Sequence, residues 1–132
     1  MSHDHLYPFE FSGELDIAFL NDLFDGDMRY AEVVFSDFLK ELPTYWREVE
    51  DAFAQKNILA VKSAVHKCKT LFGYVGHTQV LNRFQTFENK CGTAKDIQDI
   101  AADYHELVKT KAIAHEIIEK EYQRLKKYHQ RA

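Results

Sequence analysis

Apolar side chains recur every three or four residues over most of this chain, which is the spacing of one buried face on an α-helix. The segment 57–76 is the clearest case, because at about 100° per residue its apolar and polar positions separate into two faces. The apolar face carries Ala60, Val61, Ala64, Val65, Cys68, Leu71, Phe72 and Val75. The polar face carries Lys62, His66, Lys69, Thr70 and Gly73. His66 is at the centre of the polar face, so we expect it to point away from the core.

The same spacing predicts two helices before this segment. A short helix over about residues 14–24 should end at a turn containing Gly26, and Asp27 can cap the helix that follows. That next helix should be long and amphipathic, over residues 27–56, with Pro43 inside it. A proline removes one backbone hydrogen bond, so we expect a kink or a brief break near Glu41. The apolar pattern resumes in phase after the proline, which favours a kink.

Asn57 is a suitable N-cap for the helix that carries His66, and Gly76 is a natural C-terminal stop. Thr78 is expected to cap the next helix, which residues 91–93 close. A final helix should run from Asp96 to about Tyr128. Its predicted apolar stripe is Ile97, Ile100, Tyr104, Leu107, Val108, Ala112, Ile113, Ile117, Ile118, Tyr122 and Leu125.

Long amphipathic helices with short connections predict an all-α fold, an antiparallel up-down four-helix bundle with an additional short N-terminal helix. The 132 residues, of which 45% are hydrophobic, suffice for a single domain over 1–132. Residues 14–128 would form the helical bundle and residues 1–13 an irregular arm. Pro8 and Gly13 oppose regular structure in the arm, but Leu6, Tyr7, Phe9 and Phe11 are apolar enough to lie across the bundle.

Composition excludes several classes of function. A net charge of −4 provides no global basic field for nucleic acid. The two cysteines lack metal-ligand spacing and are too few for a disulfide framework, which predicts reduced thiols in a cytoplasmic protein. No apolar run approaches the ~20 residues that span a bilayer, and the N-terminus does not resemble a signal peptide, so we expect no membrane association.

Motifs for metal, hydrolytic or nucleotide chemistry are also missing from the sequence. No histidine follows a glutamate by three residues, as di-iron bundles require, and His115-Glu116 does not continue into a His-Glu-x-x-His motif. There is neither a phosphate-binding glycine loop nor a Gly-x-Ser-x-Gly elbow. His3 and His5 are interpreted as part of a flexible start. We therefore expect no metal and no cofactor.

The polar face around His66 is the remaining candidate site. Imidazole is a good nucleophile near neutral pH. Lys69 lies one turn later on the same face and could neutralise a phosphoryl group on the ring, and Lys62 lies one turn earlier. Gly73 would leave room for a partner. The alternatives are a solvated histidine, ordinary surface lysines, and a glycine required by close helix packing.

Residues 66–76, HKCKTLFGYVG, resemble the signature of histidine-containing phosphotransfer (HPt) domains. That signature has the phosphorylated histidine, a lysine three residues later, a small residue at seven and glycine at ten, which His66, Lys69, Gly73 and Gly76 match. Weaker likenesses follow in the family's order along most of the chain. They are Leu23-Phe24 with Gly26-Asp27, FLKELP at 38–43, Ala52-Phe53-Ala54 leading to Asn57, and Phe87-Glu88.

The resemblance implies a monomeric phosphorelay carrier that is not itself an enzyme. His66 would accept a phosphoryl group, through Nε2, from a receiver-domain aspartate and pass it to another receiver. The implied partners are response-regulator receivers and a hybrid sensor histidine kinase. The family usually has glycine where this chain has Thr70, which could restrict which receivers dock or place a hydroxyl near the phosphoryl group. The alternative is a helical-bundle interaction module that binds such domains without accepting phosphate.

Overall fold

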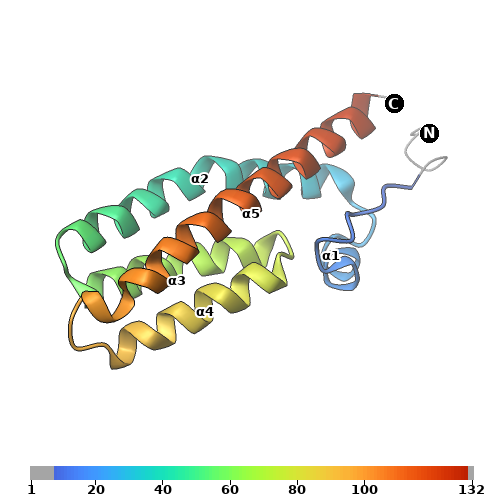
Figure 1. Ribbon diagram of the computed structural model, residues 1–132. Coiled ribbons are helices and arrows are strands. Elements are labelled where there is room, and N and C mark those ends of the chain that lie inside the picture. Colours follow the sequence, from blue (N-terminus) through green and yellow to red (C-terminus); the bar gives the residue numbers. More distant parts are fainter. Residues whose placement is uncertain (1–7, 131–132) are drawn as a thin grey trace.

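Four long helices pack side by side in the computed structural model, and a short fifth helix precedes them (Figure 1). The structure describes residues 8–130. The helices are α1 (Ile17–Phe24), α2 (Met28–Ala54), α3 (Ile58–Tyr74), α4 (Thr78–Thr93) and α5 (Gln98–Gln130). Each of α2 to α5 packs against two others, in the pairs α2–α3, α3–α4, α4–α5 and α2–α5, and α1 packs on α2. The predicted all-α, up-down four-helix bundle with a short N-terminal helix is confirmed.

Polar side chains fix where three of the helices begin. Asp16, Asp27 and Asn57 each accept a hydrogen bond from the backbone N–H three residues later, at 3.0–3.1 Å. The caps at Asp27 and Asn57 are as predicted, whereas α1 begins at Ile17, later than expected, because Asp16 caps it. Each such cap is worth ~1 kcal/mol of helix stability. The cap at Asn57 therefore sets the start of α3, the helix that carries His66.

The prediction changes at the start of α4 and holds inside α2. Thr78 does not cap α4: it is the first helical residue, His77 occupies the N-cap position, and the Thr78 hydroxyl donates to Asp16 Oδ2 at 3.3 Å. The cap prediction is wrong because tertiary contact with α1 engages this hydroxyl. Helix α2 runs through Pro43 without a break, as the in-phase apolar pattern favoured.

The buried face of α5 differs from the predicted stripe at two positions. Ala112 is exposed and Ile113 is 63% exposed, whereas Ala114 and Ile118 are fully buried. The reason is angular, because Ile113 lies about 120° around the helix from the buried Leu107, and Ala114 only about 20°. In a long helix, apolar side chains also occur on the solvent side, so the apolar character of these two residues was misleading.

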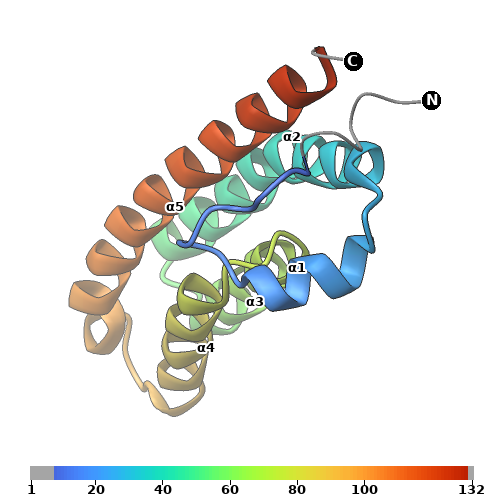
Figure 2. The ribbon, with the colours of Figure 1, turned by 90° about the vertical axis from the view of Figure 1, so that its right-hand side faces the viewer.

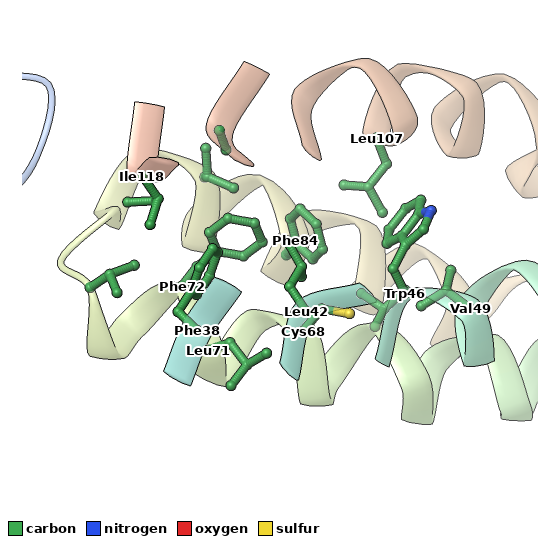
Figure 3. Packing of buried hydrophobic residues seen from close by; sticks show 14 of the residues in the cluster. Phe38, Leu42, Trp46, Val49, Cys68, Leu71, Phe72, Phe84, Leu107 and Ile118 are labelled. Carbon is green, nitrogen blue, oxygen red and sulfur yellow. The ribbon is translucent and has the colours of Figure 1, made fainter. Parts of the chain in front are cut away.

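Aromatic rings from α2, α3 and α4 fill the centre of the bundle (Figure 3). The Phe72 ring lies 5.1 Å from that of Phe38 on α2 and 5.0 Å from that of Phe84 on α4, measured between centroids. Cys68, one turn earlier on α3, is fully buried, and burial raises the pKa of its thiol to about 12. With this face held in the core, the rotation of α3 is fixed and His66 must lie outside.

The arm lies across the bundle in the part that the structure describes (Figure 2). Phe11 is buried, with its ring 6.2 Å from that of Phe35. Glu121 on α5 is almost fully buried and accepts a hydrogen bond from the backbone N–H of Ser12 at 2.7 Å. Arg124 pairs with Glu121 and also donates to the backbone carbonyl of Glu10 at 2.7 Å. The expectations for Leu6, Tyr7, His3 and His5 concern residues outside the described range.

The turn between α3 and α4 is held against α1. Gly76 has a φ of +69°, as suits its predicted role as helix stop, and a Cβ there would lie 2.7 Å from Leu20 Cγ. Its carbonyl accepts a hydrogen bond from the backbone N–H of Asp16 at 2.8 Å. His77 is buried, and neither ring nitrogen has a hydrogen-bond partner among residues 8–130. Burial lowers the pKa of His77, although nearby Glu14 opposes this effect.

This histidine should make the fold less stable in mild acid. Because the folded-state pKa of His77 is below the ~6.5 of a free histidine, the unfolded chain takes up a proton that the folded chain refuses. The free energy of unfolding should therefore fall as the pH drops from 7.5 to 5.5. Urea unfolding of wild type and of His77→Phe, which cannot titrate, measures this. An equal loss in both proteins would show that other groups cause it.

Candidate functional site

Helix α3 presents its polar face between α2 and α4, and His66 is at the middle of that face. The His66 side chain is 58% exposed, as the sequence predicted. The two neighbouring lysines diverge from it. Lys67 turns towards α2 and pairs with Glu48 at 3.0 Å, whereas Lys69 turns towards α4. The candidate site is therefore built from α3 and α4, with an open side towards solvent.

A single carboxylate on α4 joins the histidine to the lysine. His66 Nδ1 lies 3.2 Å from both carboxylate oxygens of Glu88. Lys69 Nζ lies 3.0 Å from Glu88 Oε1 and donates to Gln85 Oε1 at 2.6 Å. The side chains of Lys69 and Glu88 are only 14% and 13% exposed, respectively, so the ion pair is shielded from water and salt more than a surface pair would be.

The protonation of the site follows from the charge on Glu88. Burial is the largest single influence and opposes ionisation, but the hydrogen bonds and the positive charges of Lys69 and His66 together lower the pKa of Glu88. At neutral pH the carboxylate is therefore ionised and can only accept hydrogen bonds. His66 Nδ1 must then carry the proton that it donates. In the neutral ring this leaves the lone pair on Nε2, which has no hydrogen-bond partner among residues 8–130.

The other predicted residues divide between the site and the packing around it. The hydroxyl of the exposed Thr70 donates to the backbone carbonyl of His66 at 3.2 Å. At Gly73, a Cβ would lie 3.2 Å from Leu81 Cδ1, so close packing against α4 accounts for this glycine. The Nζ of Lys62 lies 3.3 Å from where a Cβ on Gly92 would be, so this ammonium lies along α4. Partner contact by these residues stays a prediction.

Sequence reasoning assigned no role in the site to Glu88 or Gln85. Both lie on α4, about one turn apart, and reach the α3 residues across the helix interface. Phe87-Glu88 was part of the family resemblance, but the spacing along the chain could not show which side chain of α4 meets His66. The only sequence signal was that Gln85 and Glu88 are three residues apart, so that both side chains lie on one side of the helix.

Other classes of site find no support in the described part of the chain. Among residues 8–130, no group of three or more His, Cys, Asp or Glu side chains is arranged to hold a metal ion. In the same range, no helix combines the length and hydropathy that crossing a bilayer requires. Comparisons of the chain with protein-family models, curated proteins and solved structures find no match.

Proposed function

We propose that this protein is a phosphoryl carrier of a two-component phosphorelay, with His66 as the residue that is phosphorylated. The observation that carries the proposal is the exposed imidazole whose Nδ1 is held by an ionised carboxylate, which leaves the lone pair of the neutral ring on Nε2. The HPt-like motif from His66 to Gly76 supports the same assignment. The partners would be response-regulator receivers, with a hybrid sensor histidine kinase upstream.

The transfer step needs no nucleotide and no proton transfer at the attacking nitrogen. The Nε2 lone pair of His66 forms a bond to the phosphorus of a receiver aspartyl phosphate. The P–O bond to the aspartate breaks, and its electrons return to the aspartate carboxylate. The proton stays on Nδ1, where Glu88 stabilises the positive charge that develops on the ring. Return of the phosphoryl group to a second receiver reverses these events, so the protein carries a group and turns over no small substrate.

The neighbouring residues have supporting roles in this proposal. Lys69 would contact the phosphoryl oxygens, for which its ammonium must exchange part of its contact with Gln85 and Glu88. Lys62 adds positive charge near the site. Thr70 lies next to His66 on the outer face and would limit how closely a receiver approaches. Gly73, one turn further on, packs against Leu81 of α4, and in the proposed carrier its lack of a side chain would also leave room for the receiver.

Labelling with radioactive phosphate tests the proposal directly. Receiver domains phosphorylated on aspartate are incubated with the full chain, and the chain is then examined for label that is stable in base and labile in acid, as phosphohistidine is. The expected result is transfer of label from at least one receiver within minutes. Absence of label with every receiver that binds the chain would overturn the carrier function.

A second candidate function is an interaction module that binds receiver domains without accepting phosphate. The observation in its favour is that the ammonium of Lys69 already has two partners, Gln85 and Glu88, and is not free for a phosphoryl group. This candidate predicts receiver binding that does not change when the receiver is phosphorylated. The labelling experiment above separates the two functions, because only the carrier acquires phosphohistidine.

A further inference from the structure

A groove of about 320 Å³ lies beyond the histidine, where α1, α2 and α3 meet. Six apolar or aromatic side chains line it, and three of them are strongly exposed: Leu23 at 43%, Tyr30 at 51% and Tyr74 at 56%. Exposed large apolar side chains that gather in one depression are typical of a protein-binding surface. The groove is separate from the Glu88 side of His66, because it opens between α2 and α3.

The groove begins close to the candidate site. Tyr74 is eight residues after His66 on α3, which is about 12 Å along the helix axis. A protein interface of ordinary size covers roughly 800 Å² on each partner, so one docked protein would cover both places. An occupant of the groove would therefore be part of the same partner that reaches His66.

The charged residues that line the groove indicate which charges its occupant should carry. The groove is also lined by Asp37 and Glu41, one turn apart on α2 and both exposed. Neither has a hydrogen bond or an ion pair with another residue in the range 8–130, and the other six lining residues are uncharged. By contrast, the two lysines beside His66 each have a carboxylate partner, Glu48 for Lys67 and Glu88 for Lys69. The carboxylates at the groove are therefore unpaired negative charges, whereas the charges beside His66 already neutralise one another.

We propose that the groove selects receivers that present an apolar side chain flanked by lysine or arginine, with Asp37 and Glu41 as the residues that determine this specificity. The inference rests on the proposed function, since it takes the occupant to be a segment of the receiver that exchanges a phosphoryl group with His66. The apolar side chain enters between Leu23, Tyr30 and Tyr74. The basic residues beside it pair with the two carboxylates, which rejects receivers that carry acidic residues at this place.

Two designed helical peptides test the charge selectivity without any phosphoryl transfer. Both carry the same leucine stripe, flanked by lysines in one peptide and by glutamates in the other, and fluorescence anisotropy measures their binding to the full chain. We expect the basic peptide to bind about tenfold more tightly. The double variant Asp37→Lys/Glu41→Lys should reverse the preference. The control variant Glu106→Lys/Glu116→Lys changes the net charge equally on the exposed face of α5 and should not.

Phosphoryl transfer from receivers then tests the identity of the occupant. For receivers that label His66, the double variant at Asp37 and Glu41 should raise KM about tenfold and leave kcat unchanged, because neither residue touches the reacting atoms. Equal binding of the two peptides, or a preference that the control variant also reverses, would overturn the inference. Selective binding of the basic peptide without labelling of His66 by any receiver would overturn the identification of the occupant as a receiver. In that case the charge selectivity of the groove would stand while the proposed function fails.

Discussion

A His66→Gln variant should take up no acid-labile label from any receiver that labels the wild-type protein, a loss of at least about a thousandfold. The amide of glutamine has no nucleophilic nitrogen lone pair, so no N–P bond can form at this position. The fold should be unaffected, because the side chain is largely exposed and the pair between Lys69 and Glu88 does not depend on it. The free energy of unfolding should change by no more than about 0.5 kcal/mol.

The matched control is His115→Gln on α5, which replaces a half-buried histidine by the same residue on the helix diagonal to α3. This variant should be labelled at the wild-type rate. Circular dichroism and urea unfolding of both variants establish that neither has lost its structure. Labelling of His66→Gln as fast as wild type would place the phosphoryl group elsewhere and refute the carrier role of His66.

Replacing Glu88 with glutamine should slow phosphoryl transfer to His66 about tenfold. The carboxylate forms charge-assisted hydrogen bonds with His66 Nδ1 and with Lys69, whereas an amide forms only neutral ones to the ring. The difference between the two kinds of hydrogen bond is ~1.4 kcal/mol, which corresponds to a factor of ten in rate. The amide could also turn its NH₂ group towards the ring, so that the proton moves to Nε2 and the lone pair is lost there.

Single-turnover labelling by one phosphorylated receiver, followed by rapid quenching, measures this rate. Glu48→Gln is the control, because it removes a carboxylate from the exposed pair with Lys67 at similar distance from α3 but away from the ring. It should leave the rate within about twofold of wild type, since exposed pairs often contribute only a few tenths of a kcal/mol and this one does not touch the ring. If both variants slowed transfer equally, the effect would come from the loss of a negative surface charge in general. The contact between Glu88 and His66 Nδ1 would then have no specific role.

Much of the fold could be predicted from local signals. The caps at Asp27 and Asn57 and the stop at Gly76 are short-range features, because a side chain or a φ angle decides them within a few residues. The failures have tertiary causes. The Thr78 hydroxyl is engaged by Asp16 from a segment 62 residues away. Ile113 has the polarity of a core residue but lies about 120° around the helix from the buried Leu107, and the neighbours of α5 determine that the Leu107 side is the one buried.

The candidate site divides in the same way. The exposure of His66 could be predicted, since the apolar residues of α3 fix the rotation of the helix. The partners of Lys69 could not, because they lie 16 and 19 residues further along the chain on α4. Whether Lys69 reaches these two residues depends on how far α4 is shifted along α3. Side-chain packing between the two helices, such as that of Gly73 against Leu81, determines this shift. No periodicity in the sequence expresses that shift.

The carboxylate shared by His66 and Lys69 has a consequence for the energy at which a phosphoryl group would be held. Glu88 already neutralises Lys69, so an arriving phosphoryl group meets a neutral ion pair and not a free cation. Its negative charges also lie near those of Glu88, and like charges at short range repel in a partly buried site. In the proposed carrier, the phosphorylated form therefore has a high group-transfer potential. We expect the equilibrium with a receiver aspartate to stay close to balance, so that the concentrations of the phosphorylated receivers set the direction of flow.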